Sequence, residues 1–231
     1  MSQAALDILK REHRAISAVL FCLKHTVGEA RRGAIVPPFA MIHAVLDYLT
    51  SFPNRFHHPK EDTYLFPAVL ARAPDLEPVI ADLLAQHEEG EERVSDLKDR
   101  AAELQTLWNG RWQGDGAAKF EAFADAVDSY VDFERAHGRK EGVEVMPRAQ
   151  EALTEEDWAP IEAAFSANDD PIFGEEPRSR FDNLYSRIVA LAPAPMGYAE
   201  REKPAKAPPP PEPESRLERA SRQKLLTLNW I

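Results

Sequence analysis

The strongest constraint in this sequence is an internal repeat of a histidine and a glutamate four residues apart, followed by an apolar pair and a proline. The copies occupy residues 57–67 and 137–147 and share these offsets, with the key residues His57, Glu61, His137 and Glu141. A single histidine lies on an apolar stripe one helix before each copy, His13 and His87 respectively. Residues four apart share one face of a helix, so the six side chains are expected to meet on the axis of a helical bundle.

Apolar residues recur at alternating steps of three and four through most of the first 150 residues, which is typical of bundle helices. The pattern predicts four long helices with short connections, over about residues 6–27, 38–69, 78–108 and 117–145. Pro53 and Pro59 interrupt the second of them, where a kink or short break is expected. Since no segment shows sustained period-two alternation, the predicted fold is all-α, an up-down four-helix bundle.

The chain changes character after Ala149, which divides it into a bundle and appendages. Thr154 and Asp157 resemble a capping box that opens a further helix, and another helix is expected over residues 178–191. A stretch rich in proline, alanine, glutamate and lysine follows, and it should be extended or disordered. The predicted units are the bundle over residues 1–150 and a helical extension packed on it over 151–192. The Pro-rich linker follows over 193–213, and a short basic amphipathic segment over 214–231.

Composition narrows the class of protein. The chain has 231 residues, a formal net charge of −11 and one cysteine, Cys22. An acidic surface argues against nucleic-acid binding, because phosphate contacts need clustered lysine and arginine. A single cysteine excludes an internal disulfide or a thiolate cluster, as expected in a reducing compartment. No apolar run approaches the roughly 20 residues that span a bilayer, and the first residues lack the features of a signal peptide, so a soluble cytoplasmic protein is expected.

The six residues of the repeat favour a metal site over a set of ordinary core side chains. All six lie in phase with apolar stripes, so the bundle would bury two carboxylates and four imidazoles together. Each buried charge costs on the order of several kcal/mol unless it is neutralised, and metal ions would neutralise it. This donor set suits first-row divalent metals, iron above all, with manganese or zinc less favoured. The absence of thiolate clusters argues against iron–sulfur centres and structural zinc.

The pattern resembles the hemerythrin-like, or HHE cation-binding, family over roughly residues 5–150, and the segment FHHPKEDTYLFP is close to the family's characteristic second-helix segment. The segment LTEEDWAPIEAAFSANDDPIFGEE also resembles a tail common in bacterial members. The resemblance implies a non-heme di-iron centre bridged by carboxylates and by an oxo or hydroxo group. On this chain it implies two bridging glutamates and four terminal histidines, namely Glu61, Glu141, His13, His57, His87 and His137.

One departure from the oxygen-carrying members of the family bears on function. Those proteins have five histidines, with His-x-x-x-His on one helix, whereas this sequence has Glu141 at the second such position. Two histidines, two bridging carboxylates and a solvent bridge would leave each metal one open position. That symmetry favours reactions of oxygen, peroxide or nitric oxide over reversible carriage, and the resemblance does not decide between a binding or sensing protein and an enzyme. An alternative is a metal-gated adaptor that contacts a protein partner through residues 214–231.

Two further polar residues lie close to the ligand candidates in sequence. His58 adjoins His57 but is displaced by about 100° around the helix, which makes it a lesser candidate for a ligand or a proton relay. Glu134 lies one turn before His137, where it could hydrogen-bond a ligand histidine.

Overall fold

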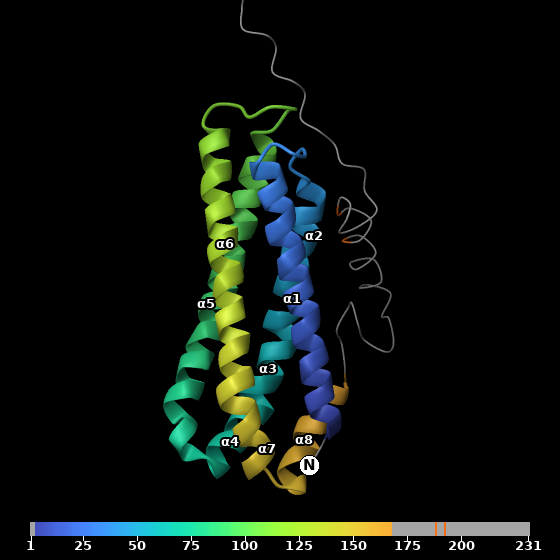
Figure 1. The fold of residues 1–231 in the computed structure, drawn as a ribbon, viewed down its shortest axis with the longest axis vertical. Coiled ribbons are helices and arrows are strands. Elements are labelled where there is room, and N and C mark those ends of the chain that lie inside the picture. Colours follow the sequence, from blue (N-terminus) through green and yellow to red (C-terminus); the bar gives the residue numbers. More distant parts are fainter. Residues whose placement is uncertain (1–2, 168–187, 189–191, 193–231) are drawn as a thin grey trace, which may run out of the picture.

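The apolar stripes form four helical rods in the computed structural model, which describes residues 3–167, 188 and 192 (Figure 1). The first rod is α1 (Gln3–Arg31). The second rod consists of consecutive segments, namely α2 (Phe39–Ser51), η1 (Pro53–His57), α3 (His58–Lys60), η2 (Glu61–Leu65) and α4 (Phe66–Arg72). The third rod is α5 (Glu77–Thr106), which the short η3 (Pro74–Leu76) precedes. The fourth rod joins α6 (Gly116–Lys140), η4 (Glu141–Val145) and α7 (Met146–Ala152).

The rods alternate in direction because short connections join their neighbouring ends (Figure 1). α1 packs against α2 and α6, and α5 packs against the same two helices on the other side, so the four rods close into a ring. No strand occurs in the part of the chain that the structure describes. The predicted all-α up-down bundle is therefore confirmed. No described helix is long and apolar enough to cross a membrane.

Two hydrophobic clusters fill the bundle, a lower one at the end where α1 begins and an upper one toward the end where α1 stops. On α1, Leu9 belongs to the lower cluster and Ile16 to the upper one, and His13 lies between them. On α5, Leu83 and Val94 are divided between the two clusters in the same way. The predicted site thus lies at one level of the bundle, with apolar layers above and below it.

The regular α-helix of the second rod is interrupted at its prolines, as predicted for Pro53 and Pro59: α2 ends at Ser51 and π-helical turns follow. The helix widens into π-helical turns at η1 and η2, and η4 repeats this in the fourth rod. In both copies of the repeat the wide turn begins at the glutamate and is closed by an amide five residues on, before a proline that has no N–H to give. Such turns are frequent at functional sites, and here they start at Glu61 and Glu141.

A further helix, α8 (Glu155–Ser166), packs on α1 beside the lower cluster (Figure 1). The predicted capping box is confirmed: Thr154 Oγ1 accepts from the Asp157 amide at 3.3 Å, and the Asp157 carboxylate accepts from the Thr154 amide at 2.8 Å. Asp157 also pairs with Arg72, so the helix start is tied to the second rod. Of the helix predicted over 178–191 the structure describes only Ile188, and the predicted segments 193–213 and 214–231 lie outside the described residues.

Candidate metal centre

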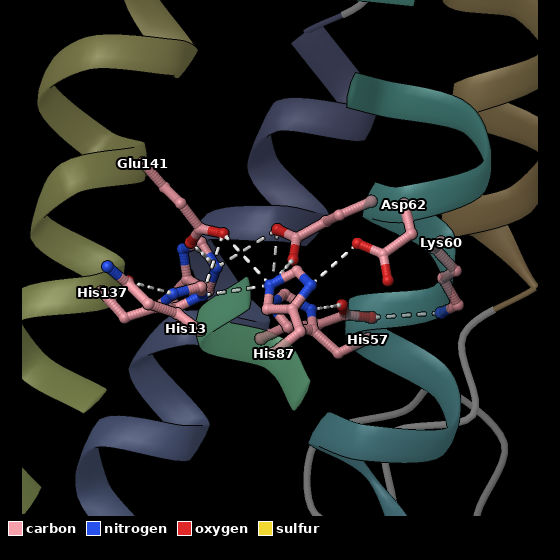
Figure 2. A network of polar contacts seen from close by, with 10 residues as sticks. His13, His57, Lys60, Asp62, His87, His137 and Glu141 are labelled. Atoms are coloured by element: carbon pink, nitrogen blue, oxygen red, sulfur yellow. Dashed lines mark hydrogen bonds and ion pairs between the residues drawn. The ribbon is translucent and has the colours of Figure 1, made fainter. Parts of the chain in front are cut away.

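The structure brings all six predicted residues together between the two hydrophobic clusters. Figure 2 shows the four histidines and Glu141 directed toward one another. Every rod contributes: α1 and α5 supply one histidine each, and the second and fourth rods supply one His/Glu pair each. All of them are buried except His13, whose side chain is 26% exposed. Each glutamate lies where its wide turn begins, so the backbone feature and the carboxylate coincide.

The Glu61 carboxylate divides its two oxygens between two groups of histidines. Its Oε1 lies 3.5 Å from His57 Nε2 and 3.7 Å from His13 Nε2. Its Oε2 lies 3.7 Å from His87 Nε2. One oxygen therefore faces the pair formed by His13 and His57, and the other faces the opposite side.

The Glu141 carboxylate is placed in the same way from the fourth rod. Its Oε2 lies 3.2 Å from His13 Nε2, while its Oε1 lies 3.1 Å from His137 Nε2 and 3.9 Å from His87 Nε2. Both carboxylates thus span the same two groups of imidazoles. A carboxylate placed in this manner can bridge two cations, one in each group.

The donor set is suited to cations. All four oxygens of Glu61 and Glu141 are buried, and within the described chain only the site histidines lie near enough to neutralise them. A buried carboxylate without a donor costs several kcal/mol of folding free energy. The ligand atoms of His13, His57 and Glu61 lie within 4.8 Å of one another, as do those of Glu61, His87 and Glu141. These two groups overlap at Glu61, and a third group, His58, His87 and His137, overlaps them at His87, so together they contain the residues that could hold metal ions.

Protons take up part of the charge when no metal is bound. Burial opposes protonation of His13, but Glu141 and Glu61 outweigh it and raise the pKa of His13 to about 10. His87 behaves alike: burial is outweighed by Asp62 and Glu141, and its pKa is raised to about 10. Conversely, the histidines outweigh burial at Glu141 and hold its pKa well below the usual value. Metal binding at this site must therefore displace protons from histidine.

Three of the histidines have an outer hydrogen-bond partner on Nδ1, which leaves Nε2 directed at the centre (Figure 2). Each partner comes from a neighbouring rod, and the pairs are Glu12 with His57 at 2.7 Å, Asp62 with His87 at 2.8 Å, and Gln86 with His137 at 3.0 Å. Such partners fix the tautomer and orientation of a ligand histidine. Glu12 is also 3.5 Å from Lys60 Nζ, and these contacts outweigh burial to lower its pKa.

These outer partners were not predicted from the sequence, although a signal for them exists. Each is the chain neighbour of a site residue: Glu12 precedes His13, Asp62 follows Glu61, and Gln86 precedes His87. A neighbour is displaced by about 100° around the helix, so it points toward an adjacent rod and meets the histidine there.

Replacing Glu12 with glutamine should weaken metal binding about 10–100-fold, the usual cost of losing an outer partner of a ligand histidine. The amide cannot offer the negative charge that the His57 imidazole now contacts. Metal affinity measured by competition with a chelator checks this. Glu88→Gln is the matched control, because Glu88 also adjoins a site histidine but is exposed. Equal affinities in the two variants would contradict the role of Glu12.

His58 lies within the cluster of site histidines, although its position in the sequence made it a lesser candidate for a ligand. It is buried, and its ring stacks on that of His87 with centroids 4.0 Å apart and planes 7° apart. One nitrogen each of His58, His87 and His137 lies within 4.8 Å of the others. An imidazole binds a metal in its own plane, so two rings stacked in parallel cannot both bind the same ion without turning. As placed, His58 covers His87, and burial keeps the pKa of His58 well below the usual value.

Glu134 is near the centre but has a different partner from the one predicted. Tyr130 and His137 are the neighbours that act most on its charge, and within the described residues the Nδ1 atoms of His57, His87 and His137 bond to other side chains. Gly90 leaves room for this carboxylate, because a Cβ at Gly90 would lie 3.2 Å from Glu134 Oε1. Burial raises the pKa of Glu134 above its ordinary value.

A four-rod bundle with imidazoles and carboxylates gathered at its core defines a helical protein that can hold metal cations. The chain belongs to the hemerythrin family, since the family model described as the hemerythrin HHE cation binding domain matches residues 4–149. The predicted family and fold are thereby confirmed, and metal binding follows from membership. Comparisons with curated proteins and with solved structures give no significant match.

Proposed function

We propose that this protein is a non-heme di-iron protein that binds, senses or reacts with oxygen or a related small oxidant, peroxide or nitric oxide among them. The observation that carries the proposal is the pair of buried carboxylates, whose oxygens lie between two groups of imidazole nitrogens and face no other group that could neutralise them in the described chain. In this assignment Glu61 and Glu141 are the bridges. His13 and His57 are the terminal ligands of one ion, and His87 and His137 are those of the other.

Iron fits the proposal because imidazole and carboxylate together suit first-row metals that react with oxygen. When bound, a pair of irons would supply the electrons that oxygen, peroxide or nitric oxide needs in order to react. The protein's own residues do the rest. Glu12, Asp62 and Gln86 orient the imidazoles, and the hydrophobic clusters above and below the site limit the access of water. The adaptor alternative depends on residues 214–231, and no contact of the described residues favours it.

Metal analysis of protein purified without oxygen tests the site. The expected result is two irons per chain and a near-ultraviolet absorption band that appears when the reduced protein meets air. A chain that holds one ion, or only zinc, would contradict the proposal. Further measurements then distinguish a binding or sensing protein from an enzyme. A stoichiometric and reversible spectral change on titration with oxygen supports binding or sensing, whereas repeated turnover of peroxide or nitric oxide supports an enzyme.

A further inference from the structure

The two halves of the repeat differ at the residues that follow the histidine and the glutamate. His58 follows His57 in the first copy, where Gly138 follows His137 in the second. Likewise Asp62 follows Glu61, where Gly142 follows Glu141. At both positions the second half lacks a side chain that the first half has.

Both side chains of the first half act on the same histidine. His58 stacks on the His87 ring, and Asp62 accepts a hydrogen bond from His87 Nδ1 at 2.8 Å. In the repeat, the counterpart of His87 is His13, which lies between the first and fourth rods. The counterparts of the two covering residues are glycines, so nothing equivalent covers His13.

The environment of His13 differs accordingly from that of His87. Its side chain is 26% exposed, against 6% for His87. Within the described residues, His13 Nδ1 has no hydrogen-bond partner, whereas the three other histidines of the predicted set have one each. The centre is therefore covered on the His87 side and uncovered on the His13 side.

A small cavity lies at this uncovered side, between α1 and α6. Its volume is about 40 Å³, and its lining runs inward from Ser17 and Gly138 to His57, His58, His137 and Glu141 of the centre. That volume is a little more than the roughly 30 Å³ that one molecule occupies in liquid water, which suits a ligand of two or three heavy atoms. Ser17 is exposed, which places the mouth of the cavity at the surface. A Cβ built at Gly138 would meet no atom within 4 Å, so Gly138 borders open space.

We propose that Gly138 is a specificity-determining residue, which keeps an access path between α1 and α6 open to ligands of two or three heavy atoms. The inference rests on the proposed function, because the ligand's target is the metal centre. Beyond that function, it specifies the path by which a ligand reaches the centre and the largest ligand that can pass. Both are set by the missing side chain at position 138. A larger side chain there would extend into the cavity and obstruct the route without replacing any residue of the centre.

The test uses the full-length, air-oxidised, iron-loaded protein with sodium azide, a three-atom anion, as the probe. Gly138→Leu should slow azide association at least tenfold by stopped-flow absorbance, and Gly138→Ala should slow it less. Ala136→Leu is the matched control, because it adds a leucine to the exposed face of the same helix two residues away. Its association rate should equal that of the wild type, and iron content should be the same in all variants.

An unchanged azide rate in iron-loaded Gly138→Leu would overturn the proposed route. If the leucine variant loads no iron, the alanine variant decides, because its added methyl group meets no neighbouring atom. An alanine variant as fast as the wild type would then overturn the route. A wild-type centre that binds benzoate as fast as azide would overturn the size limit. Failure of the wild type to hold iron would instead contradict the proposed function.

Discussion

Glu141→Gln should weaken metal binding by more than the roughly 10–100-fold expected for loss of an outer partner. The glutamine keeps the size of the side chain but removes the negative charge that lies between His13 and His137. It also replaces one carboxylate oxygen with an NH₂ group, which cannot bind a cation. Because Glu141 faces both groups of histidines, both ions should be affected together rather than one.

Metal content per chain after dialysis, together with the near-ultraviolet spectrum, measures this loss. Glu144→Gln is the control, because Glu144 is exposed in the same wide turn. Circular dichroism should show that both variants remain helical. Retention of two ions by Glu141→Gln would exclude Glu141 as a bridge and require a new ligand set. His58→Ala should lose less metal than Glu141→Gln, because His58 stacks on His87 and does not bridge.

The level of the site in the bundle could be predicted because it depends only on helix periodicity. The stripes place His13 and His87 in phase with core residues, and the repeat places the two His/Glu pairs likewise. Four rods with short connections must then bring these residues to one level, whatever the details of packing. The fold and the convergence of the six residues therefore followed from spacing alone.

What could not be predicted depends on the local backbone and on which rods are neighbours. Pro53 and Pro59 indicated a break, because a proline interrupts the hydrogen bonds of a regular helix. The interruption is present, but it takes the form of π-helical turns, which the prolines alone did not indicate. His58 was given a lesser role from its 100° displacement, but that displacement points it at α5 and His87 rather than at solvent. The contacts of Glu12 likewise depend on the second rod lying beside α1.

Removing the metal should lower the thermal midpoint by about 8–16 °C near neutral pH. Free metal at about a thousand times its dissociation constant contributes about 4 kcal/mol of unfolding free energy. A domain of this size changes its midpoint by roughly 2–4 °C per kcal/mol. The metal-free protein would retain carboxylates whose buried oxygens only protonated histidines can balance. Differential scanning calorimetry of loaded and chelator-treated protein measures the difference, and equal midpoints would contradict a metal-supported core.

The same difference should grow as the pH rises. In the metal-free protein His13 and His87 have pKa values of about 10, raised from the ordinary 6.5. A raised pKa stabilises the folded state fully below pH 6.5, and that contribution is lost as the pH rises toward 10. Metal binding has the opposite dependence, because it releases these protons and tightens as they leave. The metal-free midpoint should therefore fall between pH 6.5 and 9 while the loaded midpoint falls less.

His13→Gln separates this cause from a general effect of pH. The variant lacks one of the two raised groups, so the midpoint of its metal-free form should fall less steeply between pH 6.5 and 9 than that of the wild type. His43→Gln is the control, because His43 contacts Gln105 away from the centre, and its pH dependence should match the wild type. A gap between loaded and metal-free midpoints that shrinks with rising pH would show that protons do not substitute for the metal at His13 and His87.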